Sequence, residues 1–136
     1  MVSDTNRSEK FCSYQFGREA EYIVAVFLKS RGWKLSLSKG SRGAADIIAI
    51  RNSIKWLIQV KSSNLIPRIR GYEIKRLTEA AELVNASAVI ATLQPSQTIM
   101  NHDVGRNRNS HLNDGVYPIG IYSLIFYLLP NWSRIS

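Results

Sequence analysis

The sequence has little cysteine, no long apolar run and no apolar N-terminal segment. Its single cysteine, Cys12, cannot form an internal disulfide, and no Cys/His cluster with zinc-site spacing is present. These absences favour an intracellular protein, and we expect a cytoplasmic location. The longest apolar stretch, residues 116–129, is shorter than the roughly 20 residues that a spanning helix needs, and it contains Pro118 and Gly120. We therefore expect no membrane partner.

Acidic residues are also few, because 10 of them accompany 18 lysines and arginines in 136 residues, for a formal net charge of +8. So large an excess on a small chain is typical of a protein with a polyanionic partner. Nucleic acid is favoured over an anionic membrane surface, since no predicted helix is both basic and strongly amphipathic. The hydrophobic content of 45% and the length suit one globular core. We expect a flexible arm over residues 1–13 and a single domain over 14–136.

Apolar periodicity predicts two helices and several strands. One helical stripe runs from Ala20 to Leu28, followed by Gly32 at the place of a left-handed C-terminal cap, and a second runs from Ile74 to Val84. Four β-rich runs are predicted as strands: 33–38, 45–50, 54–61 and 88–93. Residues 94–115 are polar and left unassigned, and residues 116–129 are expected to be core or subunit interface. The order α-β-β-β-α-β predicts an α/β (α+β) fold with a central mixed β-sheet flanked by helices.

A predicted hairpin between the two central strands brings polar side chains together. If Asn52 and Ser53 are its two turn residues, Asp46 lies directly across from Gln59. Directly opposed residues project to the same face, with Lys61 one diagonal step away. A slip of one residue would send Asp46 to the other face. That other face of the second strand is apolar and suited to packing on a helix: Ile54, Trp56, Ile58 and Val60.

A carboxylate, a carboxamide oxygen and an ammonium group at one sheet edge are typical of a metal-dependent hydrolytic centre. Mg²⁺ prefers oxygen ligands, and it polarises a phosphoryl oxygen and activates water. A lysine beside it orients or deprotonates that water and offsets charge on the transition state. Glu21, at the border of the first helical stripe, is a candidate third ligand. The alternative is that Glu21, Gln59 and Lys61 are ordinary solvated residues.

A helix glutamate, a hairpin aspartate and a Gln-x-Lys strand, in this order, resemble the PD-(D/E)xK nuclease superfamily. More narrowly, they resemble the archaeal Holliday junction resolvases (Hjc-like), over about Gly17 to Leu93. The matching segments are an opening helix, a serine-bearing loop with the aspartate strand, the catalytic strand, and the stretch leading into the next helix: GREAEYIVAVFLKSRGW, SKGSRGAADIIAI, IQVKSS and RIRGYEIKRLTEAAEL. The resemblance implies a restriction-endonuclease-like core.

The resemblance also implies the site residues. Glu21 and Asp46 would be metal ligands, Gln59 would occupy the second acidic ligand position, and the Val60 backbone carbonyl would add an oxygen. Lys61 would be the catalytic lysine. The cofactor implied is Mg²⁺, with Mn²⁺ as a substitute. Because Gln59 replaces the family's usual glutamate, the site loses one negative charge, and we expect weaker metal binding.

Further expectations concern the substrate and the partner. Ser38, in the loop before the aspartate strand, would approach the scissile phosphate, and the family implies a homodimer that cuts two opposed strands of a four-way junction. The aspartate follows Ala44 and Ala45 instead of the family's nominal proline. Basic residues near the centre are predicted to bind DNA: Lys39, Arg42, Arg68, Arg70, Lys75 and Arg76, with Lys29, Arg31 and Lys34 nearby and Arg106 and Arg108 toward a junction arm. A solvated surface is the other interpretation of these charges.

Three functions are therefore compatible with the sequence. The first is a Mg²⁺-dependent endodeoxyribonuclease that resolves four-way junctions in DNA recombination and repair, associated with the nucleoid. The second keeps this centre but cuts other DNA, as restriction-like or repair-like enzymes do. The third is a catalytically silent paralogue that only binds DNA, which the exchange at Gln59 keeps open.

Overall fold

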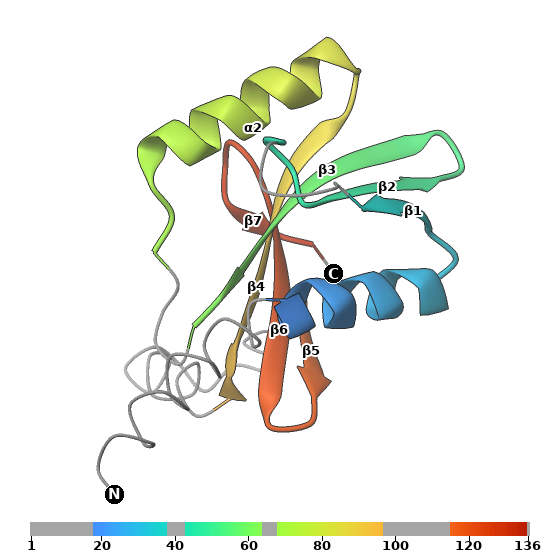
Figure 1. Ribbon diagram of the computed structural model, residues 1–136, viewed down its shortest axis with the longest axis vertical. Coiled ribbons are helices and arrows are strands. Elements are labelled where there is room, and N and C mark those ends of the chain that lie inside the picture. Colours follow the sequence, from blue (N-terminus) through green and yellow to red (C-terminus); the bar gives the residue numbers. More distant parts are fainter. Residues whose placement is uncertain (1–17, 38–42, 64–67, 97–114, 136) are drawn as a thin grey trace, which may run out of the picture.

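A seven-stranded mixed β-sheet lies between two helices in the computed structural model, which describes residues 18–37, 43–63, 68–96 and 115–135 (Figure 1). The N-terminal helix is described over residues 18–30. The other elements follow in chain order: β1 (Lys34–Leu37), β2 (Ile47–Arg51), β3 (Ile54–Ser62), α2 (Gly71–Leu83), β4 (Ser87–Pro95), β5 (Val116–Ile119), β6 (Tyr122–Leu128) and β7 (Ser133–Arg134). The predicted fold class, a mixed sheet flanked by helices, is confirmed.

The strand order is β1-β2-β3-β4-β6-β5, with β7 paired to β6. Strands β3 and β4 are parallel and are connected through α2, whereas the other neighbouring strands are antiparallel. A parallel pair needs a crossover connection, and α2 supplies it. The four strands and the second helix predicted from the sequence all occur, with ends that differ by a few residues.

The N-terminal helix covers one face of the sheet. Its buried residues Ala20, Val24 and Leu28 belong to one core cluster with Ile58 and Val60 of β3. The helix ends in a Schellman motif, in which the Trp33 N–H donates to the Leu28 carbonyl at 3.1 Å and the Gly32 N–H to the Lys29 carbonyl at 3.2 Å. Gly32 has φ +90°, which confirms the predicted left-handed cap. Of the apolar face predicted for β3, Ile58 and Val60 are buried in this cluster and Trp56 packs half-buried against it, whereas Ile54 at the start of the strand is 46% exposed.

Helix α2 covers the opposite face of the sheet. Leu77 and Ala81 of α2 pack with Leu57 of β3 and with Ala88 and Ile90 of β4. Leu57 is next to Ile58 in sequence but lies in the other cluster, because successive strand residues point to opposite faces. The middle of strand β3 is thus buried on both sides, and Gln59 and Lys61 lie toward its end.

The apolar stretch at residues 116–129 forms a β-hairpin, where the sequence predicted a single element. Strand β5 turns into β6 at Gly120, which has φ +60°. Strand β6 then pairs with β4 and buries Leu124, Ile125 and Phe126, so the stretch is part of the core of this chain. Residues 97–114 lie outside the described part. No helix within the described ranges is long and apolar enough to cross a membrane.

Candidate active site

The β2–β3 hairpin has the predicted two-residue turn. Asn52 adopts φ +56°, a conformation that asparagine tolerates better than most residues. The register runs from Arg51 opposite Ile54 to Ile47 opposite Ile58, which confirms the predicted register. The ladder ends at Ile47, however. Our prediction that Asp46 pairs with Gln59 across the strands is wrong, because the Asp46 N–H donates to the Ile58 carbonyl at 2.8 Å.

This break in the ladder places the Asp46 carboxylate just before the start of β2, beside β3. Ala45 packs in the cluster under α2, and Ile47 packs in the cluster on the opposite face. Strict alternation would put residues 45 and 47 on one face, so the chain steps by one residue here, as at a β-bulge. The Val60 N–H donates to Asp46 Oδ2 at 2.8 Å. The carboxylate therefore occupies the place of a backbone partner beside β3.

Asp46 is half-buried, and its surroundings act on its charge in both directions. Burial raises the pKa of its carboxyl above the ordinary value, and the negative charge of Glu73 adds to this effect. The hydrogen bond from the Val60 N–H and the positive charge of Lys61 oppose the rise. The net direction is upward, which means that the folded protein holds this anion at a cost. A cation bound beside it would remove that cost.

Glu21 reaches the same place from the N-terminal helix. It follows the fully buried Ala20 and is itself half-buried. The pKa of its carboxyl is raised by burial and then by the negative charge of Asp46, whereas Arg18 lowers it. The structure thus brings together two carboxylates that the sequence separates by 25 residues. Two neighbouring acids with raised pKa values are typical of a site for a cation or a proton.

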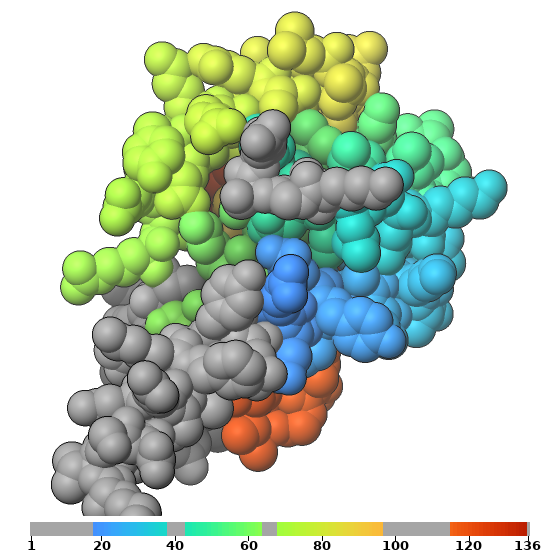
Figure 2. Space-filling model, in the orientation of Figure 1, coloured from blue at the N-terminus to red at the C-terminus, as the bar shows by residue number. Residues whose placement is uncertain are grey.

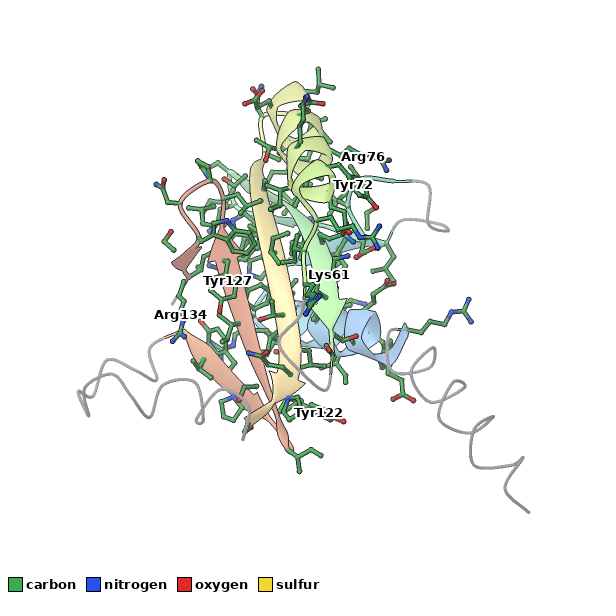
Figure 3. All side chains as sticks on the ribbon, turned by 90° about the vertical axis from the view of Figure 1, so that its left-hand side faces the viewer. Lys61, Tyr72, Arg76, Tyr122, Tyr127 and Arg134 are labelled. Atoms are coloured by element: carbon green, nitrogen blue, oxygen red, sulfur yellow. The ribbon has the colours of Figure 1, made fainter. Side chains whose placement is uncertain are left out.

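Lys61 makes an ion pair that the sequence analysis did not anticipate. Its Nζ contacts Oε2 of Glu73, in the first turn of α2, and the two side chains are 24% and 21% exposed. Figure 3 shows Lys61 toward the end of β3, below the α2 residues Tyr72 and Arg76. The available signal in the sequence was an acid in the first turn of the helix that follows β3, where the helix dipole also favours an acid.

Gln59 lies on β3 two residues before Lys61, so its side chain points to the same face. It is half-buried and lies beside Ile90 of β4 in the parallel register. Within the part of the chain that the structure describes, its carboxamide makes no hydrogen bond to another residue. Its oxygen is thus not committed to a protein partner there, but its role as a ligand stays a prediction.

The donor set near Asp46 fits a hard cation with few acidic ligands. Among the residues with a described position, no three His, Cys, Asp or Glu side chains form a group that could hold a metal ion. The candidates are then the Glu21 and Asp46 carboxylates, completed by the neutral oxygens of Gln59 and the Val60 carbonyl. Oxygen donors suit Mg²⁺, which is usually held by one or two carboxylates plus water and phosphate.

The predicted DNA-binding residues divide into three groups. Ser38, Lys39, Arg42, Arg106 and Arg108 lie outside the described residues. The second group is exposed around the start of α2, the yellow-green part of Figure 2: Arg68, Arg70, Lys75 and Arg76. Lys75 lies 4.0 Å from Glu79 in a solvent-exposed pair, which leaves its charge available to solvent.

The third group does not lie near the site, contrary to our expectation. Arg31 is ten residues beyond Glu21 on the N-terminal helix and its end, or about 15 Å at the rise of an α-helix. Lys29 and Lys34 are exposed at that same end. These residues are close to Glu21 in the sequence, but the helix between them separates them from it in space. Arg31 instead stacks on aromatic rings.

Comparisons with known proteins agree with this architecture. No protein-family model and no curated protein sequence matches the chain. A solved structure does match: Hjc, a Holliday junction resolvase from the archaeal hyperthermophile Archaeoglobus fulgidus, with a TM-score of 0.52 and 25% identity. The match covers 56% of this chain and 66% of that chain, just under two thirds. The chain therefore has an Hjc-like fold, which confirms the restriction-endonuclease-like core and the resemblance inferred from the sequence.

Proposed function

We propose that this chain is a metal-dependent DNA endonuclease that resolves four-way junctions by hydrolysing phosphodiester bonds. The observation that carries the proposal is the position of Asp46. Its carboxylate lies beside the β3 backbone, electrostatically coupled to Glu21 of the N-terminal helix and to Lys61 of β3. This arrangement occurs in an Hjc-like fold, and the solved relative is described as a Holliday junction resolvase. The net charge of +8 supports a DNA substrate.

The proposed ligands of the cation are Glu21, Asp46, the Gln59 side-chain oxygen and the Val60 carbonyl. A bound Mg²⁺, or Mn²⁺ in its place, would polarise the phosphoryl oxygen and lower the pKa of an attacking water. Lys61 holds its ammonium on the α2 side of the sheet, where it stabilises charge that develops on the phosphate. The carboxylate of Glu73 restricts Lys61 to one position. Glu73 is therefore a positioning residue in this mechanism.

DNA would approach over the start of α2. Arg68, Arg70 and Arg76 are exposed there, next to the turn that carries Glu73. Phosphate contacts from these side chains would orient the strand toward Asp46 and make binding strongly dependent on salt. Ser38 is proposed to approach the scissile phosphate. A homodimer would present two such centres to opposed strands of one junction.

Cleavage of defined substrates tests the proposal. The purified chain is incubated with Mg²⁺, Mn²⁺ or Ca²⁺ and with four-way, flapped or linear duplex DNA. We expect symmetric cuts in the four-way junction with Mg²⁺ and Mn²⁺, and loss of cutting in Asp46→Asn and Lys61→Ala with binding retained. Glu79→Gln, an exposed acid of α2 away from Lys61, is the control and should cut normally. Preferential cutting of the duplex would replace the junction function with a restriction-like or repair-like one.

A second candidate function is DNA binding without cleavage. It is favoured by Gln59, which leaves the centre with two carboxylates, Glu21 and Asp46, and no group of three acidic, His or Cys ligands in the described ranges. Tight junction binding with no cutting in any metal would support it. Restoration of cutting by Gln59→Glu would then show that the missing carboxylate is the cause.

A further inference from the structure

A second concave site lies at the other end of the N-terminal helix from Glu21. A cavity of about 340 Å³ opens there between the helix end, the β2–β3 hairpin and strands β5 and β6. The helix end concerned is the lighter blue one in Figure 1. Its lining includes five aromatic and two basic residues: Phe27, Trp33, Trp56, Tyr117, Phe126, Arg31 and Arg51. Neither the proposed nuclease centre nor its predicted DNA contacts around α2 use this cavity.

The aromatic rings form one connected group around the cavity, because the Phe126 ring centroid lies 6.0 Å from that of Trp56, 5.9 Å from that of Phe27 and 6.2 Å from that of Tyr117. Trp33 and Trp56 have ring centroids 4.3 Å apart at an interplanar angle of 33°. Phe27 and Tyr117 lie 4.8 Å apart at 51°. Trp33 and Phe126 are buried, and the other three residues are half-buried, so part of their surface is accessible from the cavity. A planar, polarisable group would find stacking and edge contacts here.

Two arginines at the cavity carry charge that no carboxylate of the described residues compensates. The Arg31 guanidinium carbon lies 4.9 Å from the Phe27 ring centroid and 5.3 Å from that of Tyr117, and the Arg51 carbon lies 4.6 Å from that of Trp33. Arg51 Nη1 also donates to the Arg31 backbone carbonyl at 3.2 Å, which holds the Arg51 side chain at the end of the N-terminal helix. Neither arginine forms an ion pair with a residue of the described segments.

This geometry favours an anion. A guanidinium stacked on a ring presents its N–H groups at the edge of the stack, and it has five donors in a rigid fork. Among the hydrogen bonds between described residues, Arg51 donates one from its guanidinium and Arg31 donates none. Two neighbouring cations repel each other, and an anion bound to both would remove that repulsion. The cavity therefore combines a surface for a planar ring with donors for an anionic group.

We propose that this cavity binds a nucleotide, with the base against the aromatic rings and the phosphate on Arg31 and Arg51. The volume is at the lower end of the range of small-ligand pockets, about 300–1,000 Å³, which suits a single base with its sugar. Base–aromatic stacking combined with arginine contacts is a general way to hold an unpaired nucleotide. The ligand is either a free mononucleotide or an unpaired nucleotide within a strand. This inference does not depend on cleavage activity.

Tryptophan fluorescence tests the proposal directly. Two of the three tryptophans line the cavity, and the third, Trp132, packs on Tyr127 with ring centroids 5.7 Å apart. In Trp132→Phe, the emission therefore reports on the cavity. This protein is titrated without metal with deoxyadenosine monophosphate, deoxyadenosine, inorganic phosphate and a short single-stranded oligonucleotide. We expect saturable quenching by the monophosphate, weaker quenching by the nucleoside and none by phosphate.

Matched variants separate the cavity from the general basic surface. Arg31→Gln and Arg51→Gln each remove one exposed charge at the cavity, and Lys34→Gln removes one on neighbouring β1, outside it. We expect each arginine variant to bind the monophosphate about tenfold more weakly, as for loss of a charge-assisted hydrogen bond, and Lys34→Gln to be unaffected. Equal effects of all three, quenching by phosphate alone, or no saturable quenching would overturn the proposal.

The source of the nucleotide follows from the same titrations. Tighter binding of the oligonucleotide than of the monophosphate, lost in the arginine variants, assigns the cavity to an unpaired nucleotide of a strand. Equal binding of both assigns it to free nucleotide. Because no metal is present and no bond is cut, a failed cleavage assay leaves this result unchanged, and failure here leaves the proposed nuclease centre standing.

Discussion

Glu73→Gln perturbs the ion pair that holds Lys61, and its effect can be derived from the structure. Both side chains are partly buried, 24% and 21% exposed, so the pair lies between two known limits. Exposed pairs contribute about 0–1 kcal/mol, and removal of one partner from a buried pair costs about 3–5 kcal/mol. We expect a coupling energy between Lys61 and Glu73 of about 1–2 kcal/mol.

Relief of repulsion makes the single variant less harmful than the coupling energy suggests. The negative charge of Glu73 also raises the pKa of the Asp46 carboxyl, so Glu73→Gln removes an unfavourable contact together with the favourable one. The net loss in free energy of unfolding should therefore be smaller than the coupling energy. A double-mutant cycle with Glu73→Gln, Lys61→Met and the double variant isolates the pair from this second effect.

Denaturant unfolding of the four proteins at one concentration and low salt provides the measurement. The exposed Lys75–Glu79 pair, 4.0 Å apart on the same helix, is the internal control and should give a coupling below about 0.5 kcal/mol. Equal coupling in the two pairs would refute the reasoning. In cleavage assays we expect Glu73→Gln to lower kcat by about tenfold with unchanged junction binding, and Glu73→Asp to restore part of it.

Three further predictions concern Asp46, Gly32 and Gln59. The raised pKa of Asp46 means that its contribution to stability is complete below the ordinary carboxyl value of 3.8 and is lost as the pH rises through the folded-state value. Asp46→Asn should therefore raise the free energy of unfolding at neutral pH but not below 3.8, as measured by denaturation at several pH values. Gly32→Ala should cost about 1–2 kcal/mol, because φ is +90° while the nearest atom to a new Cβ is 4.0 Å away; a neutral result in thermal unfolding would contradict this. Gln59→Glu should tighten Mn²⁺ binding by about tenfold in calorimetry, since it adds a charged ligand, and unchanged affinity would remove Gln59 from the ligand set.

Local patterns predicted the fold well where a residue type in its sequence context is compatible with one backbone conformation. Gly32 is an example, because a glycine after a helical stripe with basic residues in its last turn has few other roles. The turn at Asn52 and Ser53 also set the register of β2 and β3 correctly. By contrast, the hairpin within residues 116–129 was missed although Gly120 marks its turn, because apolar content does not distinguish one long element from two short ones.

The candidate site was predicted in its residues but less well in its geometry. Strand alternation placed Asp46 opposite Gln59, but the chain leaves the ladder just before Ile47, and nothing in Ala44-Ala45-Asp46 marks that step. The sequence shows Glu73 in the first turn of α2, but whether it reaches Lys61 depends on how α2 lies on the sheet, so the ion pair was overlooked. The separation of Arg31 from Glu21 could have been predicted. The helix between them was expected, and its rise per residue already places Arg31 far from Glu21.

The hydrogen bond from the Val60 N–H to Asp46 has a consequence for how this chain tolerates change. The carboxylate accepts this hydrogen bond in the place of a backbone carbonyl of the neighbouring strand, so it stabilises the sheet in addition to its proposed role in catalysis. Asparagine offers the same oxygen, whereas alanine leaves a buried donor without an acceptor. A descendant that had lost nuclease activity would therefore still retain Asp or Asn at this position. Conservation of Asp46 among relatives would accordingly report on the sheet, and conservation of Lys61 together with Glu73 would report on catalysis.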